Sequence, residues 1–261
     1  GFPVVDGLRS FLAGVRCLFD YRDFRQLPAA DPPAADEAVA DRWRDRLASG
    51  ATLEEYESAR LLADFGLPMN PARLADSEEA AVLAAAELGF PVVLKTAEPG
   101  LLHKTDQRGV ALNLADEAEL RAAYRDLANR VGSRVAVSPM VTADGVEMVL
   151  GLVRDDQFGP LILLGFGGIN VETLRDVACA LPPFDRREAR RLLDGLQLRS
   201  LLDGLRDRPA VDIDAFCLAA ERFAVMADNL QQVLDEVDIN PIIVHSGGCV
   251  AVDALVVGHA G

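Results

Sequence analysis

The segment that says most about this chain reads FPVVLKTAEPGLLHKTDQRGVALNL, residues 90–114. A run of apolar, β-branched residues ends at Lys95, and a second apolar run follows a glycine-containing loop. This pattern predicts two strands that are neighbours in sequence. The loop between them carries His103 and Lys104, although the chain has only three histidines and a net charge of −15. The loop is therefore the first candidate for a functional site.

Lys95 ends a run that is apolar enough to be buried. A buried ammonium group without a partner is costly, so something must meet it. One possibility is a salt bridge to a carboxylate in the core, and the other is a contact with a phosphate group. Gly100 and Gly109 allow close backbone approach, and Lys104 and Arg108 add positive charge. These neighbours favour the phosphate contact.

Three helices around this segment are predicted by one repeated pattern. Each opens with a Thr or Asp three residues before a Glu, which is the spacing of a capping box, and each ends at a glycine. The three sets are Thr52, Glu55 and Gly66; Asp76, Glu79 and Gly89; and Asp116, Glu119 and Gly132. The strand-like runs VVLKT, VALNL, RVAVSPM, VEMVLGLVRD and PLILLGF mix with them. The order predicts an α+β fold whose adjacent strands pair antiparallel.

The C-terminal third offers two more helices and a hairpin. The helices are expected at about 185–202 and 214–234. The hairpin reads EVDINPIIV, then the turn HSGG, then CVAVDALVV. Asp238 and Asn240 are two residues apart on one strand, so they share a face, and Asp253 lies on the returning chain. Oxygen ligands from facing strands suit Mg²⁺, although a polar pair at a strand edge is the alternative.

Two further features are weak by themselves. The stretch LLGFGGINVE is a Gly-rich loop after an apolar run, ending at Glu172, and could be only a tight turn. Glu147 heads the strand VEMVLG, where an exposed, solvated carboxylate is also expected.

The ends and the composition set broader limits. Residues 1–26 offer a short strand at 2–5 and an amphipathic helix, which are too little to bury a core. A linker is expected over 27–50, because 27–41 is rich in Pro, Ala and Asp. The acidic balance argues against nucleic acid or an anionic membrane as a partner, and no run is long enough to span a bilayer. The four cysteines lack ligand spacing and are expected to be reduced thiols: Cys17, Cys179, Cys217 and Cys249.

Together these motifs resemble the ATP-grasp part of the ADP-forming acyl-CoA synthetases, which are related to the β subunit of succinyl-CoA synthetase. The resemblance covers residues 51–257, with a small subdomain at about 51–137. It rests on GFPVVLKTAEPGLLHKTDQRGVAL, GVEMVLGLVRDDQFGP, GFGGINVETLRDV and EVDINPIIV…VAVDALVV. Residues 1–26 resemble the last strand and helix of the CoA-ligase domain that precedes ATP-grasp in fused members.

The resemblance implies a role for individual residues. Lys95 and Lys104 would contact the phosphates of ATP or ADP, Glu147 would bind the nucleotide, and the backbone near Pro139 and Met140 would meet the adenine. Asn240 and Asp253 would be the Mg²⁺ ligands. His103 matches the histidine of an HK(S/T)D motif that carries a phosphoryl group, with a hydrogen bond to phosphate as its lesser role. The chain departs from the family at Arg108, where Gly is common, and at Cys179-Ala180, where many members have Phe-Arg.

The expected activity is the nucleotide end of the reaction acyl-CoA + ADP + phosphate = carboxylic acid + CoA + ATP, through an acyl phosphate and a phosphohistidine. CoA would bind mainly outside this chain, on CoA-binding and ligase domains in cis or in a separate subunit. A cytoplasmic location and a homo-oligomeric full-length protein are also expected. The alternative is a regulatory or degenerate ATP-grasp module of a protein acetyltransferase, which a nucleotide-dependent phosphorylation assay would separate from the enzyme.

Overall fold

A computed structural model describes residues 7–26, 28–98, 109–141, 144–168, 176–204 and 209–259. The chain divides into two compact units, Gly1–Asp31 and Pro32–Gly261. In the first unit the predicted helix is present as α1 (Leu8–Gln26), and none of its residues is buried. The predicted strand at 2–5 lies outside the described residues. The larger apolar side chains of α1 are exposed, among them Leu8, Phe11, Leu12, Leu18, Phe19, Tyr21 and Phe24.

The second unit begins before the predicted end of the linker. Residues 37–47 form α2 (Glu37–Leu47), which is capped by the Asp36 side chain. Ala40, Trp43 and Leu47 of this helix are buried in the main core. The predicted linker over 27–50 is therefore wrong for residues 37–47. The physical reason is an apolar stripe at helical spacing, which must be covered once the helix forms.

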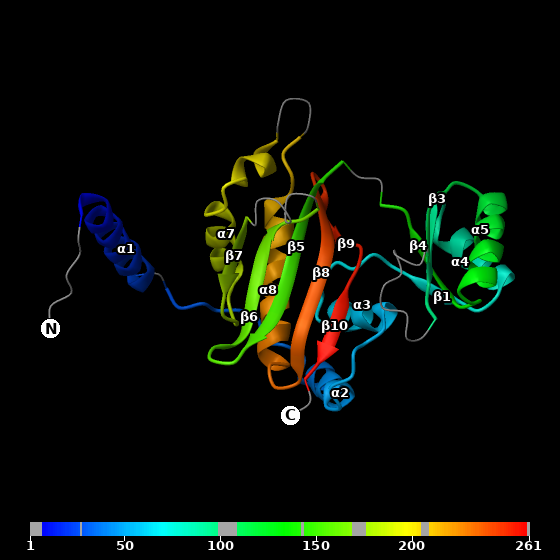
Figure 1. Cartoon of the computed structure of the whole chain (residues 1–261), viewed down its shortest axis with the longest axis horizontal. Coiled ribbons are helices and arrows are strands. Elements are labelled where there is room, and N and C mark those ends of the chain that lie inside the picture. Colours follow the sequence, from blue (N-terminus) through cyan, green and yellow to red (C-terminus); the bar gives the residue numbers. More distant parts are fainter. Residues whose placement is uncertain are drawn as a thin grey trace. The chain divides into compact units, whose positions relative to one another are not determined.

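A small sheet of four described strands has the order β1-β4-β2-β3, and every pair in it is antiparallel. Helices α4 and α5 pack on it and share its core, which includes Leu94, Leu120 and Val137. The small sheet appears at the right of Figure 1. Its elements are β1 (Arg73–Ala75), α4 (Glu78–Leu88), β2 (Val92–Thr96), β3 (Val110–Leu114), α5 (Glu117–Arg130) and β4 (Val135–Pro139).

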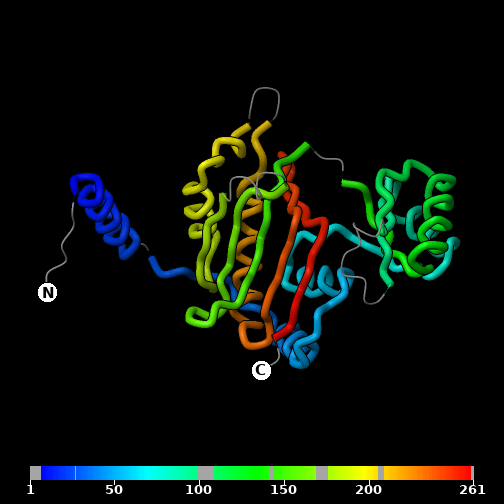
Figure 2. The backbone as a smooth tube through the Cα atoms, viewed as in Figure 1, coloured from blue at the N-terminus to red at the C-terminus, as the bar shows by residue number. Residues whose placement is uncertain are grey.

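A larger sheet of six described strands has the order β10-β8-β5-β6-β7, with β9 also paired to β8. All of its pairs are antiparallel. Figure 2 traces β5, β8 and β10 side by side, with β8 between the other two. The strands are β5 (Val146–Asp155), β6 (Gly159–Phe166), β7 (Val177–Ala180), β8 (Leu234–His245), β9 (Gly248–Ala251) and β10 (Leu255–Gly258). The antiparallel pairs predicted for neighbouring strands are confirmed for β2 with β3, β5 with β6 and β8 with β9. The neighbours β4 and β5 lie in different sheets, and the predicted strand CVAVDALVV is divided into β9 and β10.

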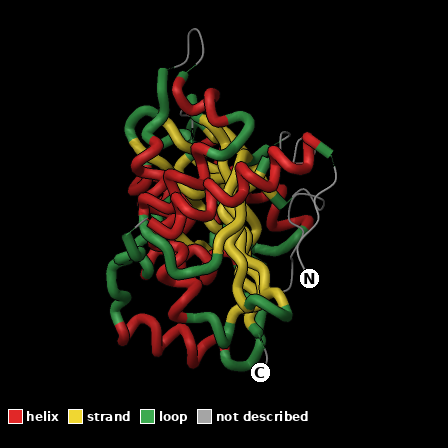
Figure 3. Tube along the Cα trace, turned by 90° about the vertical axis from the view of Figure 1, so that its left-hand side faces the viewer, coloured by secondary structure: helices red, strands yellow, loops and turns green. Residues whose placement is uncertain are grey.

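Helices cover the large sheet and complete its core. The long helix α8 (Ile213–Asn229) contacts β5, β6 and β8, and α7 (Arg186–Asp194) contacts β6 and β7. A short 3₁₀ turn, Arg199–Asp203, replaces the end of the helix expected to reach 202. Figure 3 turns the view so that the strands form a narrow band. The buried face of α8 is the predicted one, with Phe216, Ala220, Phe223 and Met226.

Helix α3 (Glu55–Asp64) belongs to the large core. Leu61 and Leu62 are fully buried there, and the helix contacts β10. The small subdomain expected at about 51–137 therefore lacks this helix, and its core runs over residues 75–137. The expected start at 51 is therefore too early by one helix, because the apolar side chains of α3 pack in the large core.

The predicted N-terminal cap is confirmed for one helix and wrong for two. Asp116 caps α5 as predicted, since its side chain accepts from the Glu119 N–H. Helix α4 is capped by Ser77 instead of Asp76. Thr52 does not cap α3, because it bridges Val257 of β10. The three predicted stop glycines all have positive φ, as C-terminal glycines of helices require: Gly66, Gly89 and Gly132.

Two further expectations concern the whole chain. No helix among the described residues has both the length and the apolar character needed to cross a membrane. The four cysteines are unpaired, as predicted, with Cys17 and Cys179 exposed and Cys217 buried.

Candidate functional site

Lys95 of the small sheet contacts two carboxylates, one on α3 and one between β9 and β10 of the large sheet. Its Nζ donates to Glu55 Oε1 at 2.7 Å and lies 3.3 Å from Asp253 Oδ2. It also lies 3.4 Å from the Val252 carbonyl oxygen. Only 12% of the lysine side chain is exposed. The salt bridge that the sequence left open as an alternative is therefore present, and it links β2 to the large core.

The electrostatic balance at Lys95 keeps it charged. Burial is the largest single influence on its pKa and acts to lower it. The carboxylates of Glu55 and Asp253 together outweigh burial, so the pKa of Lys95 lies above its ordinary value. A lysine that stays protonated although its side chain is mostly buried is suited to contact an anionic ligand.

The hairpin places Asn240 and Asp253 opposite each other. In β8 and β10, Leu255 pairs with Asp238, and in β8 and β9, Ala251 pairs with Ile242. The same register continues between these pairs, since the Val252 N–H donates to the Pro241 carbonyl at 3.0 Å. Asp253 therefore lies across from Asn240, in the short break between β9 and β10.

The local shape of β8 explains why these side chains are available. Val237 and Ile239 are buried on one face of the strand. Asp238 and Asn240 alternate with them and therefore point to the other face, as predicted. The pairing with β5 shifts register next to Asn240. Such an irregularity is a β-bulge, which turns a side chain out of the ladder. Asn240 is exposed at this point.

The charge state of Asp253 follows from its surroundings. Burial raises its pKa, and the Glu55 carboxylate raises it further, while Lys95 and the Ala254 N–H act in the opposite direction. The net effect is a pKa above the ordinary value. The pKa of Asp238 is also raised, first by burial and then by the charges of Glu236 and Asp253. Burial and neighbouring carboxylates therefore raise the pKa of both aspartates.

These residues fit a divalent cation in part. The Asp253 carboxylate lies beside Lys95, and Asn240 is across from Asp253 in the strand register. Mg²⁺ accepts one or two protein oxygens together with substrate phosphates. A purely protein-built cage is not formed, because no group of three or more His, Cys, Asp or Glu among the described residues could hold a metal. The donor set thus fits Mg²⁺ that arrives with a phosphorylated ligand.

Glu147 lies against a glycine turn. The Gly167 N–H donates to the Glu147 carbonyl at 2.7 Å. A Cβ on Gly168 would lie 2.4 Å from Glu147 Oε2, and Gly168 has φ +65°. Gly168, the last glycine of the predicted Gly-rich loop, therefore leaves room for the Glu147 carboxylate. Residues 169–175, including Glu172, lie outside the described residues.

The backbone at Pro139 and Met140 is already engaged. The Pro139 carbonyl accepts from Asn70 Nδ2 at 3.0 Å, and the Met140 N–H donates to the Pro91 carbonyl at 2.8 Å. Asn70 also donates its own N–H to the Ala251 carbonyl at 2.8 Å. Asn70 thus ties the end of β4 to the end of β9. An adenine at this position would have to use the remaining backbone groups.

His103, Lys104 and Arg108 lie outside the described residues, so the structure places none of them. Among the predicted residues, the structure brings Lys95 and Asp253 into contact and places Asn240 across from Asp253 in the strand register. Glu55 and Asn70 were not predicted as part of the site. Glu55 had been assigned only to a capping box, and no local pattern signals a partner that is 40 residues away in the chain.

The fold agrees with what a comparison with protein families shows. Residues 46–257 match the ATP-grasp domain. The chain belongs to the ATP-grasp family. It is 32% identical to the β subunit of an ADP-forming acetate–CoA ligase II from Pyrococcus furiosus, over 81% of this chain and 94% of the relative. It is 36% identical to a trans-feruloyl-CoA synthase from an unknown prokaryotic organism, over 80% of this chain and 31% of that longer protein.

Solved structures of ATP-grasp proteins have the same fold. An acetyl-coenzyme A synthetase 1 from Ca. Korarchaeum cryptofilum, in complex with coenzyme A and Ca-AMPCP, matches with a TM-score of 0.74 and 36% identity, over 80% of this chain and 93% of that one. The same enzyme with coenzyme A and Mg-AMPPCP matches with a TM-score of 0.73 and 33% identity, over 85% and 99%. The predicted α+β, ATP-grasp fold is confirmed.

Proposed function

We propose that this ATP-grasp chain is the nucleotide-binding, phosphoryl-transfer part of an ADP-forming acyl-CoA synthetase. The supporting observation is the meeting of Lys95 with Asp253, which lies opposite Asn240. A buried cation and two oxygen ligands from different elements are what a nucleotide and its Mg²⁺ require at one point. The similarity to β subunits of ADP-forming acetate–CoA ligases supports the same activity.

In this proposal Lys95 contacts the phosphates of ATP or ADP, and Asn240 and Asp253 hold the metal. A bound Mg²⁺ supplies neutralisation of phosphate charge during transfer. The related enzyme was solved with Mg-AMPPCP, which supports a magnesium nucleotide as the ligand. Glu147 binds the nucleotide beside the Gly167–Gly168 turn, and the adenine lies near Pro139 and Met140.

The metal assignment is tested by Asp253→Asn, which keeps the shape of the side chain and removes its charge. We expect Mg·ADP affinity in calorimetry to fall about tenfold, which corresponds to about 1.4 kcal/mol. Asp235→Asn is the matched control, because Asp235 is on β8 and half exposed, and its contacts are with Arg154 and His259. Unaltered Mg·ADP affinity in the Asp253 variant would contradict the assignment.

His103 is proposed to carry the phosphoryl group between the acyl site and ADP, with Lys104 beside it. A neutral imidazole nitrogen attacks the phosphorus of the acyl phosphate, and the N–P bond forms as the bond to the carboxylate oxygen breaks. A terminal oxygen of ADP then attacks the same phosphorus, and the N–P bond breaks. Structures of the related synthetase with a phosphorylated phosphohistidine segment, and with that segment pointing toward the nucleotide site, support this role.

The relay is tested by His103→Ala in the protein together with its CoA-binding and ligase part. We expect turnover to be lost while Mg·ADP binding stays within about twofold, because the imidazole carries the group and the lysines bind the nucleotide. The parent should take up acid-labile, base-stable label from γ-labelled ATP on the peptide that contains His103. Turnover of the alanine variant at the parent rate would show that His103 is only a phosphate contact.

The acyl-CoA end of the reaction lies outside this chain in the proposal. The Pyrococcus relatives are named as β subunits, which supports a separate partner, while this chain matches about three tenths of the longer relatives. We propose a CoA-binding and ligase part as the partner, in cis or as a second subunit, with residues 1–26 as the end of such a domain. A cytoplasmic, homo-oligomeric full-length protein completes the proposal.

A further inference from the structure

Glu55 is the first residue of α3, and its carboxylate is the nearest partner of Lys95. The Nζ–Oε1 distance is 2.7 Å, and the two side chains are 12% and 20% exposed. The pair joins a helix of the large core to a strand of the small sheet. Ion pairs at this depth are screened less than surface pairs, so the contact can hold Lys95 in one place.

Asp253 is the more distant and more exposed carboxylate partner of the same lysine. Its Oδ2 lies 3.3 Å from Lys95 Nζ, and 49% of its side chain is exposed. Its Oδ1 accepts from the Ala254 N–H at 2.8 Å, and Oδ2 is the oxygen nearest Lys95. Asp253 is therefore placed to change partners, whereas Glu55 is placed to keep its partner.

We propose that Glu55 is a positioning residue that retains Lys95 while Asp253 exchanges the lysine for the divalent cation of the nucleotide. This inference rests on the proposed function. Lys95 has two carboxylate partners, so Asp253 can leave it for a cation while Glu55 still holds it. The phosphates that accompany the cation then meet a lysine that is already oriented.

Removing the charge of Glu55 would have a specific consequence. Of the two carboxylates that meet Lys95 within the described residues, only that of Asp253 would remain charged. An incoming cation would then have to displace the lysine from its remaining counter-ion. The binding of nucleotide should therefore need more Mg²⁺. If Glu55 were only a charge that repels phosphate, its removal would strengthen nucleotide binding instead, so the two ideas predict opposite signs.

The test is Glu55→Gln, which keeps the size of the side chain and an oxygen acceptor for Lys95. ADP binding to the whole chain is measured by calorimetry over a series of Mg²⁺ concentrations. We expect the Mg²⁺ concentration that gives half-maximal ADP binding to rise about tenfold, because the cation must displace Lys95 from Asp253 while Glu55 no longer holds the lysine by charge. Thermal unfolding without nucleotide shows that the variant is folded.

Glu54→Gln is the matched control. Glu54 is the neighbouring residue, at the same helix start, and it also faces the small sheet, with its Oε2 3.7 Å from Arg134 Nη1. The substitution removes the same charge without touching Lys95. We expect its Mg²⁺ requirement to stay within about twofold of the parent. An equal rise in both variants would overturn the inference, because the effect would then belong to charge at the helix start.

The remaining outcomes separate the inference from the proposed function. A parent chain that fails to bind Mg·ADP would refute both. A parent that binds, with Glu55→Gln binding as well or better, would refute the role of Glu55 and leave the function intact. If the glutamine variant does not fold, Glu55→Asp replaces it, because this keeps the charge and withdraws the carboxylate by one methylene. A raised Mg²⁺ requirement supports the inference there too, and parent-like binding overturns it.

Discussion

Gly168 is the position where backbone conformation and the candidate site meet. Its φ of +65° is unfavourable for a side chain, and an added Cβ would lie 2.4 Å from Glu147 Oε2. We expect Gly168→Ala to lower the free energy of unfolding by about 1–2 kcal/mol through the backbone. We also expect it to weaken Mg·ADP binding in calorimetry, because the Glu147 carboxylate must move.

Gly159 provides the matched control for that substitution. Its φ is +76°, and a Cβ there would have no atom within 4 Å. Gly159→Ala should therefore cause a similar loss of stability in urea unfolding and leave Mg·ADP affinity unchanged. Equal nucleotide binding by the two variants would mean that the contact with Glu147 has no role in the site.

At the scale of single residues, the sequence predicted that Lys95 needs an anionic partner but not which carboxylates would contact it. A lysine at the end of an apolar strand had to be met by an anion, and the structure meets it with Glu55 and Asp253. Asp253 was predicted as a ligand in the same site. Glu55 was not, because its role depends on which core α3 joins, and that is decided by packing over long distances in the chain.

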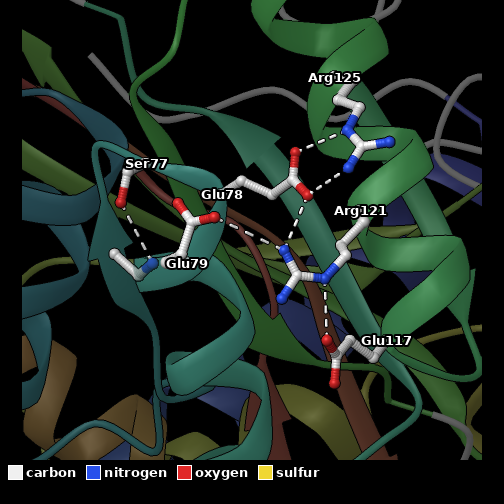
Figure 4. Close-up of polar contacts among 7 residues, drawn as sticks. Ser77, Glu78, Glu79, Glu117, Arg121 and Arg125 are labelled. Carbon is white, nitrogen blue, oxygen red and sulfur yellow. Dashed lines mark hydrogen bonds and ion pairs between the residues drawn. The ribbon is translucent and has the colours of Figure 1, made fainter.

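At the scale of elements, α4 and α5 are joined by a network centred on Glu78. Its carboxylate accepts from Arg125 at 2.7 and 2.8 Å and from Arg121 at 2.8 Å (Figure 4). Arg121 also bonds Glu117, one turn back on its own helix. The hydrogen bonds from Arg125 and then Arg121 lower the pKa of Glu78 to about 2.

This network makes a prediction about acid stability. The folded pKa of Glu78 is about 2, and an unfolded Glu has a pKa of about 4.3. The stabilisation is therefore present above about pH 4.3 and is lost as the pH falls toward 2. We expect Glu78→Gln to be less stable than the parent at pH 7 in urea unfolding, with the difference vanishing toward pH 2.

Glu79→Gln is the control on the same turn. Glu79 is 77% exposed and lies 3.8 Å from Arg121, so a surface pair of this kind should contribute little. A Glu78 variant that loses no more stability than the Glu79 variant at pH 7 would contradict the prediction.

The elements also show where local patterns suffice. The cap at Asp116 was predicted because all of its partners are within a few residues. The cap at Thr52 was wrong, because pairing with Val257 takes that residue into a β-bridge. Helix α2 was missed because the Pro- and Ala-rich stretch before it obscured Ala40, Trp43 and Leu47, whose spacing of three and four residues was the available signal.

At the scale of the whole molecule, the boundary of the second unit makes a testable prediction. A chain that begins at Pro32 should unfold at the same urea concentration as the parent, because none of the residues of α1 is buried. A chain that begins at Ala51 loses α2 with its buried Trp43 and should be destabilised by at least about 3 kcal/mol. Equal stability of the two truncated chains would show that α2 is dispensable.

The position of β8 in the large sheet has a consequence for how the chain is made. This strand lies between β5 and β10, yet β5 precedes it by about eighty residues of synthesis. A growing chain on the ribosome can complete the small sheet early, while β5 and β6 wait with an open edge until residues 234–245 emerge. Lys95 can meet Asp253 only after the residues up to 253 have emerged. Stalled nascent chains that stop before β8 should therefore expose the β5–β6 pair to added protease and to chaperones, while the small sheet already resists digestion.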